Sequence, residues 1–194
     1  MRTALLSAYE KTEELADFAR SLKERGWSIL ASTGTTKFLV EKGIEAKDVA
    51  TIVGKPILGH RVVSLSREIH AGILARDEDA EELKRLGIPR IDLVYADLYP
   101  LQAEIAKPEA TEKSVIEKTD IGGPTLLRAA GKARRIVISH SSQCAAALDF
   151  IDREAHMSDE AKRKYLAGLA GEAESVVADY AAISARFNRA IAGR

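Results

Sequence analysis

The sequence predicts an α/β protein built on a parallel β-sheet. Three observations lead to this class. Short apolar runs that are typical of buried strands alternate with amphipathic helical segments. Glycines follow several helical segments, at 26, 43 and 87, where they are expected to end the helix. Hydrophobic residues make up 46% of the 194 residues, which is enough for one sizeable core.

The first half of the chain begins with two strand–helix pairs. Residues 3–8 and 27–31 are predicted strands, and residues 11–25 and 37–42 are predicted helices. Residues 44–53 are expected to be a short extended stretch followed by a loop. Residues 54–76 contain several glycines, two histidines and three arginines, and they are expected to form a long functional loop with short strands inside it.

The second half is expected to complete the sheet and add helices. Residues 91–96 are the clearest strand and 135–139 are the last strand, while residues 78–86 and 111–118 are predicted helices. Beyond residue 142, alanine and charged residues dominate, and helices are predicted over residues 142–155, 158–170 and 172–191. Residues 1–194 are therefore expected to form one domain, in which an α/β core (1–141) carries a helical C-terminal part (142–194).

Charge and composition exclude several classes of function. The 29 basic and 29 acidic residues cancel, so no footprint for nucleic acid or for a membrane surface is expected. Cys144 is the single cysteine, and no apolar run is long enough to cross a bilayer. His60 and His70 have poor spacing for a metal site, so no metal is expected. A cytoplasmic protein is the expectation.

The most informative stretch is DIGGPTLLRAAGK, residues 120–132. Asp120 precedes Gly122 and Gly123, and an apolar helical face follows and leads to Lys132. Glycines allow close approach of a ligand to the backbone, and the start of a helix attracts anions. The alternative is an ordinary capped turn without a ligand.

Three strand ends add polar groups at further loop-to-helix junctions. The sequence STGTT places Ser32, Gly34 and Thr35 where hydroxyls and helix N–H groups can hold a phosphate, although an ordinary N-cap has the same pattern. Lys11 and Thr12 follow the first strand and could meet the same phosphate. Tyr99 ends the clearest strand, and Pro100 restricts it to extended geometry, which could aim its hydroxyl into a crevice or only pack the ring.

Taken together, these stretches resemble the IMP cyclohydrolase domain of the bifunctional AICAR transformylase/IMP cyclohydrolase family. The matching segments cover nearly the whole chain and include Lys11-Thr12, Ala31 to Thr35, Gly54 to Pro56, His70 to Arg76, Leu98 to Pro100, and Asp120 to Ala130 with Lys132. The helical tail is also similar to the end of that domain. Because the chain stops where the transformylase domain would begin, the resemblance is to a free-standing cyclohydrolase.

The resemblance implies a three-layer methylglyoxal-synthase-like sandwich and one reaction. The substrate FAICAR, a formamido-imidazole carboxamide ribonucleotide, would close its ring to give IMP and water without metal or cofactor. Lys132, Asp120 and Tyr99 fall on the family's catalytic positions. The positions for substrate or phosphate are Lys11, Thr12, Ser32, Gly34, Thr35, Arg61, Ser64, Gly122 and Gly123. A homodimer and a separate transformylase that supplies FAICAR are expected as partners.

The chain departs from the family pattern in its substrate loop. The family usually reads Gly-Arg-Val-Lys-Thr-Leu-His-Pro where this chain has residues 60–67, HRVVSLSR. Val63 stands at the lysine and cannot replace its charge, although Arg67 or His60 could compensate. Asp97 stands where asparagine is frequent, which exchanges a donor and acceptor for an acceptor alone.

Three alternatives to an active cyclohydrolase follow from the same residues. One is a nucleotide sensor, like the allosteric domain of carbamoyl-phosphate synthetase, which would have no reason to keep Tyr99, Asp120 and Lys132 together. Another is methylglyoxal synthase, which the DIGG segment and the helical tail do not suit. The third is a divergent paralogue that binds purine nucleotides without useful turnover, and Val63 makes it the main rival.

Overall fold

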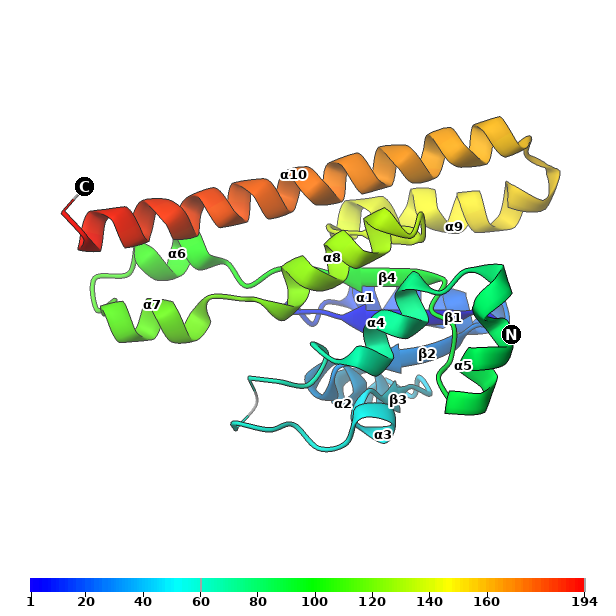
Figure 1. The fold of residues 1–194 in the computed structure, drawn as a ribbon, viewed down its shortest axis with the longest axis horizontal. Helices are drawn as coiled ribbons and strands as arrows, with labels where there is room; N and C mark the ends of the chain where they lie inside the picture. Colours follow the sequence, from blue (N-terminus) through cyan, green and yellow to red (C-terminus); the bar gives the residue numbers. More distant parts are fainter. Residues whose placement is uncertain (60, 194) are drawn as a thin grey trace.

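A computed structural model describes residues 1–59 and 61–193. It contains a five-stranded sheet in the order β3-β2-β1-β4-β5, and every neighbouring pair is parallel (Figure 1). The strands are β1 (Thr3–Ser7), β2 (Ser28–Ala31), β3 (Lys47–Asp48), β4 (Leu93–Ala96) and β5 (Ile136–Ile138). The helices are α1 (Glu13–Glu24), α2 (Thr33–Glu41), α3 (Ala50–Val53), α4 (Arg67–Leu74), α5 (Ala80–Leu86), α6 (Leu101–Ile105), α7 (Glu112–Lys118), α8 (Gly122–Lys132), α9 (Cys144–Arg153) and α10 (Asp159–Ile191). Short 3₁₀ turns occupy Asp77–Asp79, Ser141–Gln143 and Glu154–His156.

Helices cover both faces of the sheet, as the predicted sandwich requires. Helix α8 packs on β4 and β5 and against α4, whereas α1 packs on β2 and against α9. Figure 1 shows α4 and α8 in front of the sheet and α1 behind it. Both faces of the central strands are therefore buried, and all four residues of β4 are inaccessible to water.

The parallel arrangement brings the carboxyl ends of all strands to one edge. The loops that follow β1, β2, β4 and β5 leave the sheet at this edge. Ligands of open parallel sheets bind there, in the crevice beyond the strand ends. The segments that the sequence marked as polar junctions therefore meet on one side of the molecule.

Part of the predicted long loop is a helix. Residues 67–74 form α4, because Ser66 caps its start by accepting the Ile69 N–H at 3.1 Å and because Ile69 and Ile73 bury one face. The remainder of 54–66 is irregular, with one isolated bridge between Ile57 and Val62 in place of the expected short strands. The glycines that suggested a loop throughout include Gly72, which lies inside the helix.

The C-terminal part contains one long helix where two were predicted. Helix α10 runs without interruption through Gly168 and Gly171, since neither glycine adopts the left-handed conformation that would end a helix. Packing against α8 sustains the helix: a side chain added at Gly131 would lie 3.4 Å from Ala170 Cβ. Figure 1 shows the far half of α10 running past the sheet alongside α6.

Smaller differences concern where helices begin. Helix α2 starts at Thr33, so the STGTT segment is its first turn rather than a preceding loop. Residues 101–105, which the sequence analysis left unassigned, form α6. Pro124 occupies the first turn of α8, where its missing N–H costs no hydrogen bond.

The described residues contain neither a membrane-spanning helix nor a cluster of metal-ligating side chains. Among residues 1–59 and 61–193, no helix combines the length and the apolar character needed to cross a bilayer. Across the same residues, no group of three or more histidine, cysteine or acidic side chains is arranged to hold a metal ion.

The contact between α4 and the segment before β4 gives a test of the packing. A Cβ at Gly72 would lie 2.5 Å from the backbone oxygen of Pro89, which cannot move aside freely. We expect Gly72→Ala to destabilise the fold by about 1–3 kcal/mol through overpacking. Gly168→Ala is the matched control, since nothing lies within 4 Å of a Cβ there. It should stabilise α10 by up to ~1 kcal/mol. Urea unfolding measures both, and equal effects would contradict the packing argument.

Candidate active site

Lys11 and the start of α2 form one corner of the candidate site. The Lys11 ammonium donates to the carbonyl oxygens of Ala8 (2.6 Å) and Tyr9 (2.9 Å), so the Lys11 side chain folds back onto its own loop. A Cβ added at Gly34 would lie 3.8 Å from Lys11 Nζ, so the lysine and the first turn of α2 are neighbours. A cation beside the open N–H groups of a helix start is a favourable place for a phosphate.

The three hydroxyls predicted for this corner have different roles. Ser32 precedes α2 without capping it, and its hydroxyl donates to Thr35 Oγ1 at 3.0 Å. Thr35 is fully buried and accepts the Ala8 N–H at 3.1 Å, so it holds the two loops together. Thr12 caps α1 by accepting the Leu15 N–H. Of the three hydroxyls, Ser32 is therefore the one best placed to bind a ligand, whereas Thr12 and Thr35 hold the backbone in place.

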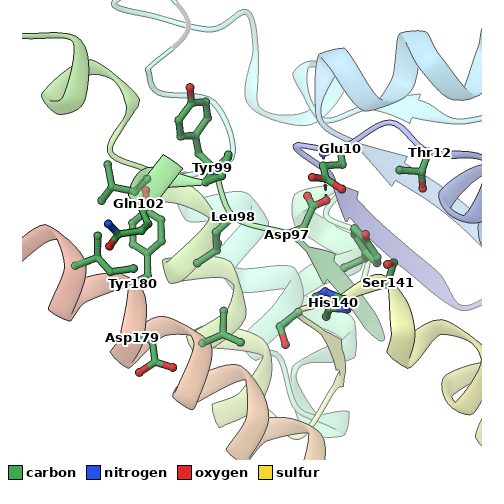
Figure 2. A pocket seen from close by; sticks show the side chains of 16 residues that line it. Glu10, Thr12, Asp97, Leu98, Tyr99, Gln102, His140, Ser141, Asp179 and Tyr180 are labelled. Atoms are coloured by element: carbon green, nitrogen blue, oxygen red, sulfur yellow. Dashed lines mark hydrogen bonds between the residues drawn. The ribbon is translucent and has the colours of Figure 1, made fainter. Parts of the chain in front are cut away.

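Asp97 connects this corner to the end of β4. Its carboxylate accepts the backbone N–H groups of Tyr9 and of Glu10, the latter at 3.1 Å (Figure 2). Two N–H donors suit a pure acceptor better than the asparagine that is frequent in the resembled family. Burial raises the pKa of Asp97, and the two N–H groups and Lys11 act in the opposite direction. The Asp97 carboxylate thus fixes the loop that carries Lys11.

The segment from Asp120 to Gly123 forms the second corner. The Gly123 N–H donates to Asp120 Oδ1 at 3.0 Å, and the Asp120 N–H donates to the Tyr180 hydroxyl of α10 at 2.7 Å. A Cβ at Gly123 would lie 2.5 Å from Asp120 Oδ2, so only glycine allows the carboxylate to fold back over the helix start. A Cβ at Gly122 would lie 3.1 Å from Ser64 Oγ, which places the substrate loop against this corner.

Tyr99 lies between the two corners and is one of the residues that line the cavity described below. Its hydroxyl donates to Glu104 Oε2 at 2.9 Å. Its ring packs edge to face on the Tyr9 ring, with 4.7 Å between the two ring centroids. Figure 2 shows the ring turned away from Asp179 and Tyr180. Burial and the bond to Glu104 raise the pKa of Tyr99. The Tyr99 hydroxyl is therefore directed at Glu104.

Lys132 is not brought next to these residues within one chain. It is exposed and is the last residue of α8, whereas Asp120 precedes the first. An 11-residue helix is about 16 Å long, so the two side chains start from opposite ends of α8. The predicted grouping of Lys132 with Tyr99 and Asp120 therefore does not follow from the fold of a single copy.

Within the described part of the substrate loop, residues 61–67, both arginines are paired with acids and neither replaces the lysine expected at Val63. Val63 is partly buried and packs on the hydrophobic core. Arg61 is exposed and pairs with Glu117 at 3.2 Å, and the exposed Arg67 pairs with Glu68 at 3.1 Å. Of the two residues expected to compensate for Val63, Arg67 is thus engaged elsewhere, and His60 lies outside the described residues.

A cavity of about 390 Å³ adjoins the site on the α10 side of β4. Glu10 and Asp97 line one wall, and Asp179 and Tyr180 of α10 line the other, as Figure 2 shows. Its lining includes no lysine or arginine among the described residues, and neither Lys11 nor Asp120 lines it. It is consequently separate from the corner that suits a phosphate.

Sequence reasoning missed two side chains that contact Tyr99. Glu104 accepts its hydroxyl, and the Lys118 ammonium lies 5.2 Å from its ring centroid. Glu104 falls in a segment without a recognised pattern, and five residues separate it from Tyr99 in the chain. A weak signal existed in the i, i+3 pairing of Glu104 with Lys107, but such pairs occur on any helix surface.

Comparison with known proteins identifies the family to which this fold belongs. Residues 14–125 match the family model described as the MGS-like domain, and the chain therefore belongs to that family. The five-stranded parallel sheet with helices on both faces is the α/β fold expected for it.

Particular relatives narrow the comparison to proteins of purine biosynthesis. Three bifunctional purine biosynthesis proteins PurH are similar to the chain. They come from Sorangium cellulosum (39% identical over 168 residues), Synechococcus elongatus (46% over 149) and Lactobacillus acidophilus (44% over 136). The matches cover 84%, 73% and 68% of this chain but only 32%, 29% and 26% of those proteins. The matched part is their N-terminal region.

One solved structure is similar over nearly its whole length. The crystal structure of ForH superposes with a TM-score of 0.77 at 30% identity, covering 95% of this chain and 96% of that one. The fold is thus found in a solved chain that is matched almost from end to end.

The partly buried carboxylate of Asp120 makes a prediction about stability and pH. Burial raises its pKa above the usual 3.8, against the opposing effect of the Gly122, Gly123 and Tyr99 N–H groups. The folded state then binds the proton more tightly than the unfolded state, so ionised Asp120 lowers stability as pH rises above 3.8. We expect Asp120→Asn to be more stable than the wild type at pH 7, with a smaller advantage near pH 4.

Urea unfolding of both proteins between pH 4 and pH 7 measures this difference. Asp179→Asn is the control, because Asp179 is exposed on α10 and its replacement should change stability little. A stability difference for Asp120→Asn that stays constant across this range would contradict the burial argument.

Proposed function

We propose that this protein is an IMP cyclohydrolase, which closes the ring of FAICAR to give IMP and water. The observation that carries the proposal is the pair of corners at one sheet edge. One offers Lys11 and the open start of α2, and the other offers Asp120 held over the start of α8. Similarity to the N-terminal region of PurH supports the choice of substrate.

The chemistry assigns each corner a task. Lys11, Ser32 and Gly34 would bind the phosphate, which fixes the nucleotide beside the substrate loop at Ser64. In the reaction the carboxamide nitrogen attacks the formyl carbon, and the tetrahedral adduct then loses water. Tyr99 and Asp120 would move the protons, while N–H groups at Gly122 and Gly123 would assist the polar edge of the substrate. The largest contribution to the rate comes from holding the formamide beside the carboxamide in the orientation needed for attack. Neither metal nor redox cofactor has a part in this scheme.

A second candidate function is a purine-nucleotide-binding paralogue without useful turnover. Val63 favours it, because its side chain packs on the core where the resembled family has a lysine. Loss of one donor to a developing oxyanion typically lowers turnover by about a hundred- to a thousandfold. Replacing Val63 with lysine separates the two: a large gain in ring closure supports the paralogue, and little change supports an active enzyme.

The partners of the proposed enzyme are likewise proposals. FAICAR must come from a separate transformylase if the chain acts alone. A homodimer is proposed from the resemblance alone, because Ile183 and Phe187 of α10 pack on a cluster of α6 and α7 residues in the same chain. Sedimentation at several protein concentrations would measure it.

The direct test is ring closure by the purified protein, followed by the change in absorbance as IMP forms. We expect turnover by the wild type and losses of about a hundredfold or more in Asp120→Ala, which removes a proton-transfer group. IMP binding by calorimetry should persist in that variant. If the wild type showed neither turnover nor IMP binding, both candidate functions would be contradicted.

Replacing Lys132 in the same assay tests whether this side chain reaches the substrate. Because one chain keeps it a helix length from Asp120, we expect Lys132→Ala to lower turnover less than Asp120→Ala does. The exposed Lys164 of α10 is the control, as Lys164→Ala should leave turnover unchanged. An equal loss in Lys132→Ala and Asp120→Ala would show that Lys132 reaches the substrate, from a second copy or in another arrangement.

A further inference from the structure

Glu104 is a buried acid that touches the proposed active site through one residue. Its side chain is almost inaccessible, with 6% of the residue exposed, although glutamate is rarely buried without a partner. Oε2 accepts the Tyr99 hydroxyl at 2.9 Å and the Lys107 ammonium at 2.6 Å. Both partners lower the pKa of Glu104, which keeps the carboxylate ionised at neutral pH.

The bond to Glu104 decides how Tyr99 can meet a ligand. A phenol has one proton to donate, and here that proton is directed to Glu104. The remaining lone pairs of the Tyr99 oxygen can only accept. Tyr99 is thus presented to the substrate as a hydrogen-bond acceptor, although a tyrosine is often expected to donate.

Every charged or titratable group that faces this pair comes from a different part of the site. Lys107 binds Glu104 from the turn after α6, and the Lys118 ammonium at the end of α7 lies 5.2 Å from the centroid of the Tyr99 ring. Tyr9 meets the ring from the loop after β1, and Asp120 receives the backbone N–H of Tyr99. Within the described residues, no carboxylate lies within salt-bridge distance of Lys118, so its charge acts on the ring.

We propose that Glu104 acts through Tyr99 as the proton-accepting end of a relay, with Lys107 and Lys118 as the cations that hold it. The proposal rests on the proposed cyclohydrolase function and deepens it, because it names the route by which the substrate nitrogen loses its proton. Glu104 is a positioning residue in this scheme, since only Tyr99 meets the substrate.

The carboxamide nitrogen forms a bond to the formyl carbon, and the π electrons of the formyl C=O move onto its oxygen. The proton of that nitrogen passes to the Tyr99 oxygen, while the Tyr99 proton passes to Glu104 Oε2. The proton then returns from Glu104 through Tyr99 to the alkoxide oxygen of the adduct and makes it a hydroxyl group. This hydroxyl group leaves as water together with the proton of the former formamide nitrogen, and the electrons of that N–H bond form the new C=N bond.

The first test is the pH dependence of ring closure in Glu104→Gln. We expect kcat at pH 7 to fall about a hundredfold, with a smaller change in KM, because proton transfer is lost and binding is kept. The rate should then rise about tenfold per pH unit toward the pKa of Tyr99, because the phenolate accepts the proton directly. Tyr99→Phe should lose the rate at every pH. The control is Glu81→Gln, an exposed glutamate of α5.

Two further measurements keep the proposal testable if Glu104→Gln folds poorly. Lys107→Met removes a half-exposed partner of Glu104. It should shift the acidic limb of kcat/KM to higher pH, because Lys107 lowers the pKa of Glu104. Ultraviolet titration, taken as the difference from Tyr99→Phe, should give a lower Tyr99 pKa in Glu104→Gln, since Glu104 raises it.

The outcomes separate this inference from the proposed function. A wild type without ring closure overturns the function, and the relay with it. A wild type that closes the ring while Glu104→Gln keeps the wild-type rate and pH profile overturns the relay alone. A uniform loss of rate in Glu104→Gln, without recovery at high pH, would also overturn it, because that is the effect of a purely structural residue.

Discussion

The hydrogen bond between the Gly123 N–H and Asp120 is the contact on which the candidate site depends. It holds a carboxylate against the start of α8, at a place where a side chain on Gly123 would collide with Asp120 and Leu98. Tyr180 fixes the Asp120 backbone from α10, so the long C-terminal helix contributes directly to the site. The carboxylate is kept partly out of water at a cost in stability, which is typical of groups retained for chemistry.

A second acid gives the site its other fixed point. Asp97 binds two N–H groups of the loop after β1 and thereby sets the position of Lys11. Because Asp97 ends β4 and Tyr99 follows it by two residues, the same strand end orients both the phosphate corner and the tyrosine. The departure from asparagine at this position is therefore accommodated by the local donors.

The surroundings of Tyr99 bear on whether Val63 abolishes activity. The core holds Val63, and the arginines of the substrate loop are paired with acids. Lys107 of the turn after α6 is paired in the same way with Glu104, whereas the Lys118 ammonium at the end of α7 faces the Tyr99 ring. Lys118 is therefore the cation near Tyr99 that comes from outside the substrate loop.

The fold class, four of the five strands and the junctions at Lys11, Ser32 and Asp120 were predictable from the sequence alone. These depend on local periodicity, turn residues and capping, which short stretches encode. Only the tertiary structure decided that 67–74 is helical, that α10 is continuous, that Lys132 lies a helix away from Asp120, and that Glu104 receives the Tyr99 hydroxyl. Each of these depends on packing or hydrogen bonding between segments, and a contact across elements is not written in the pattern of either one.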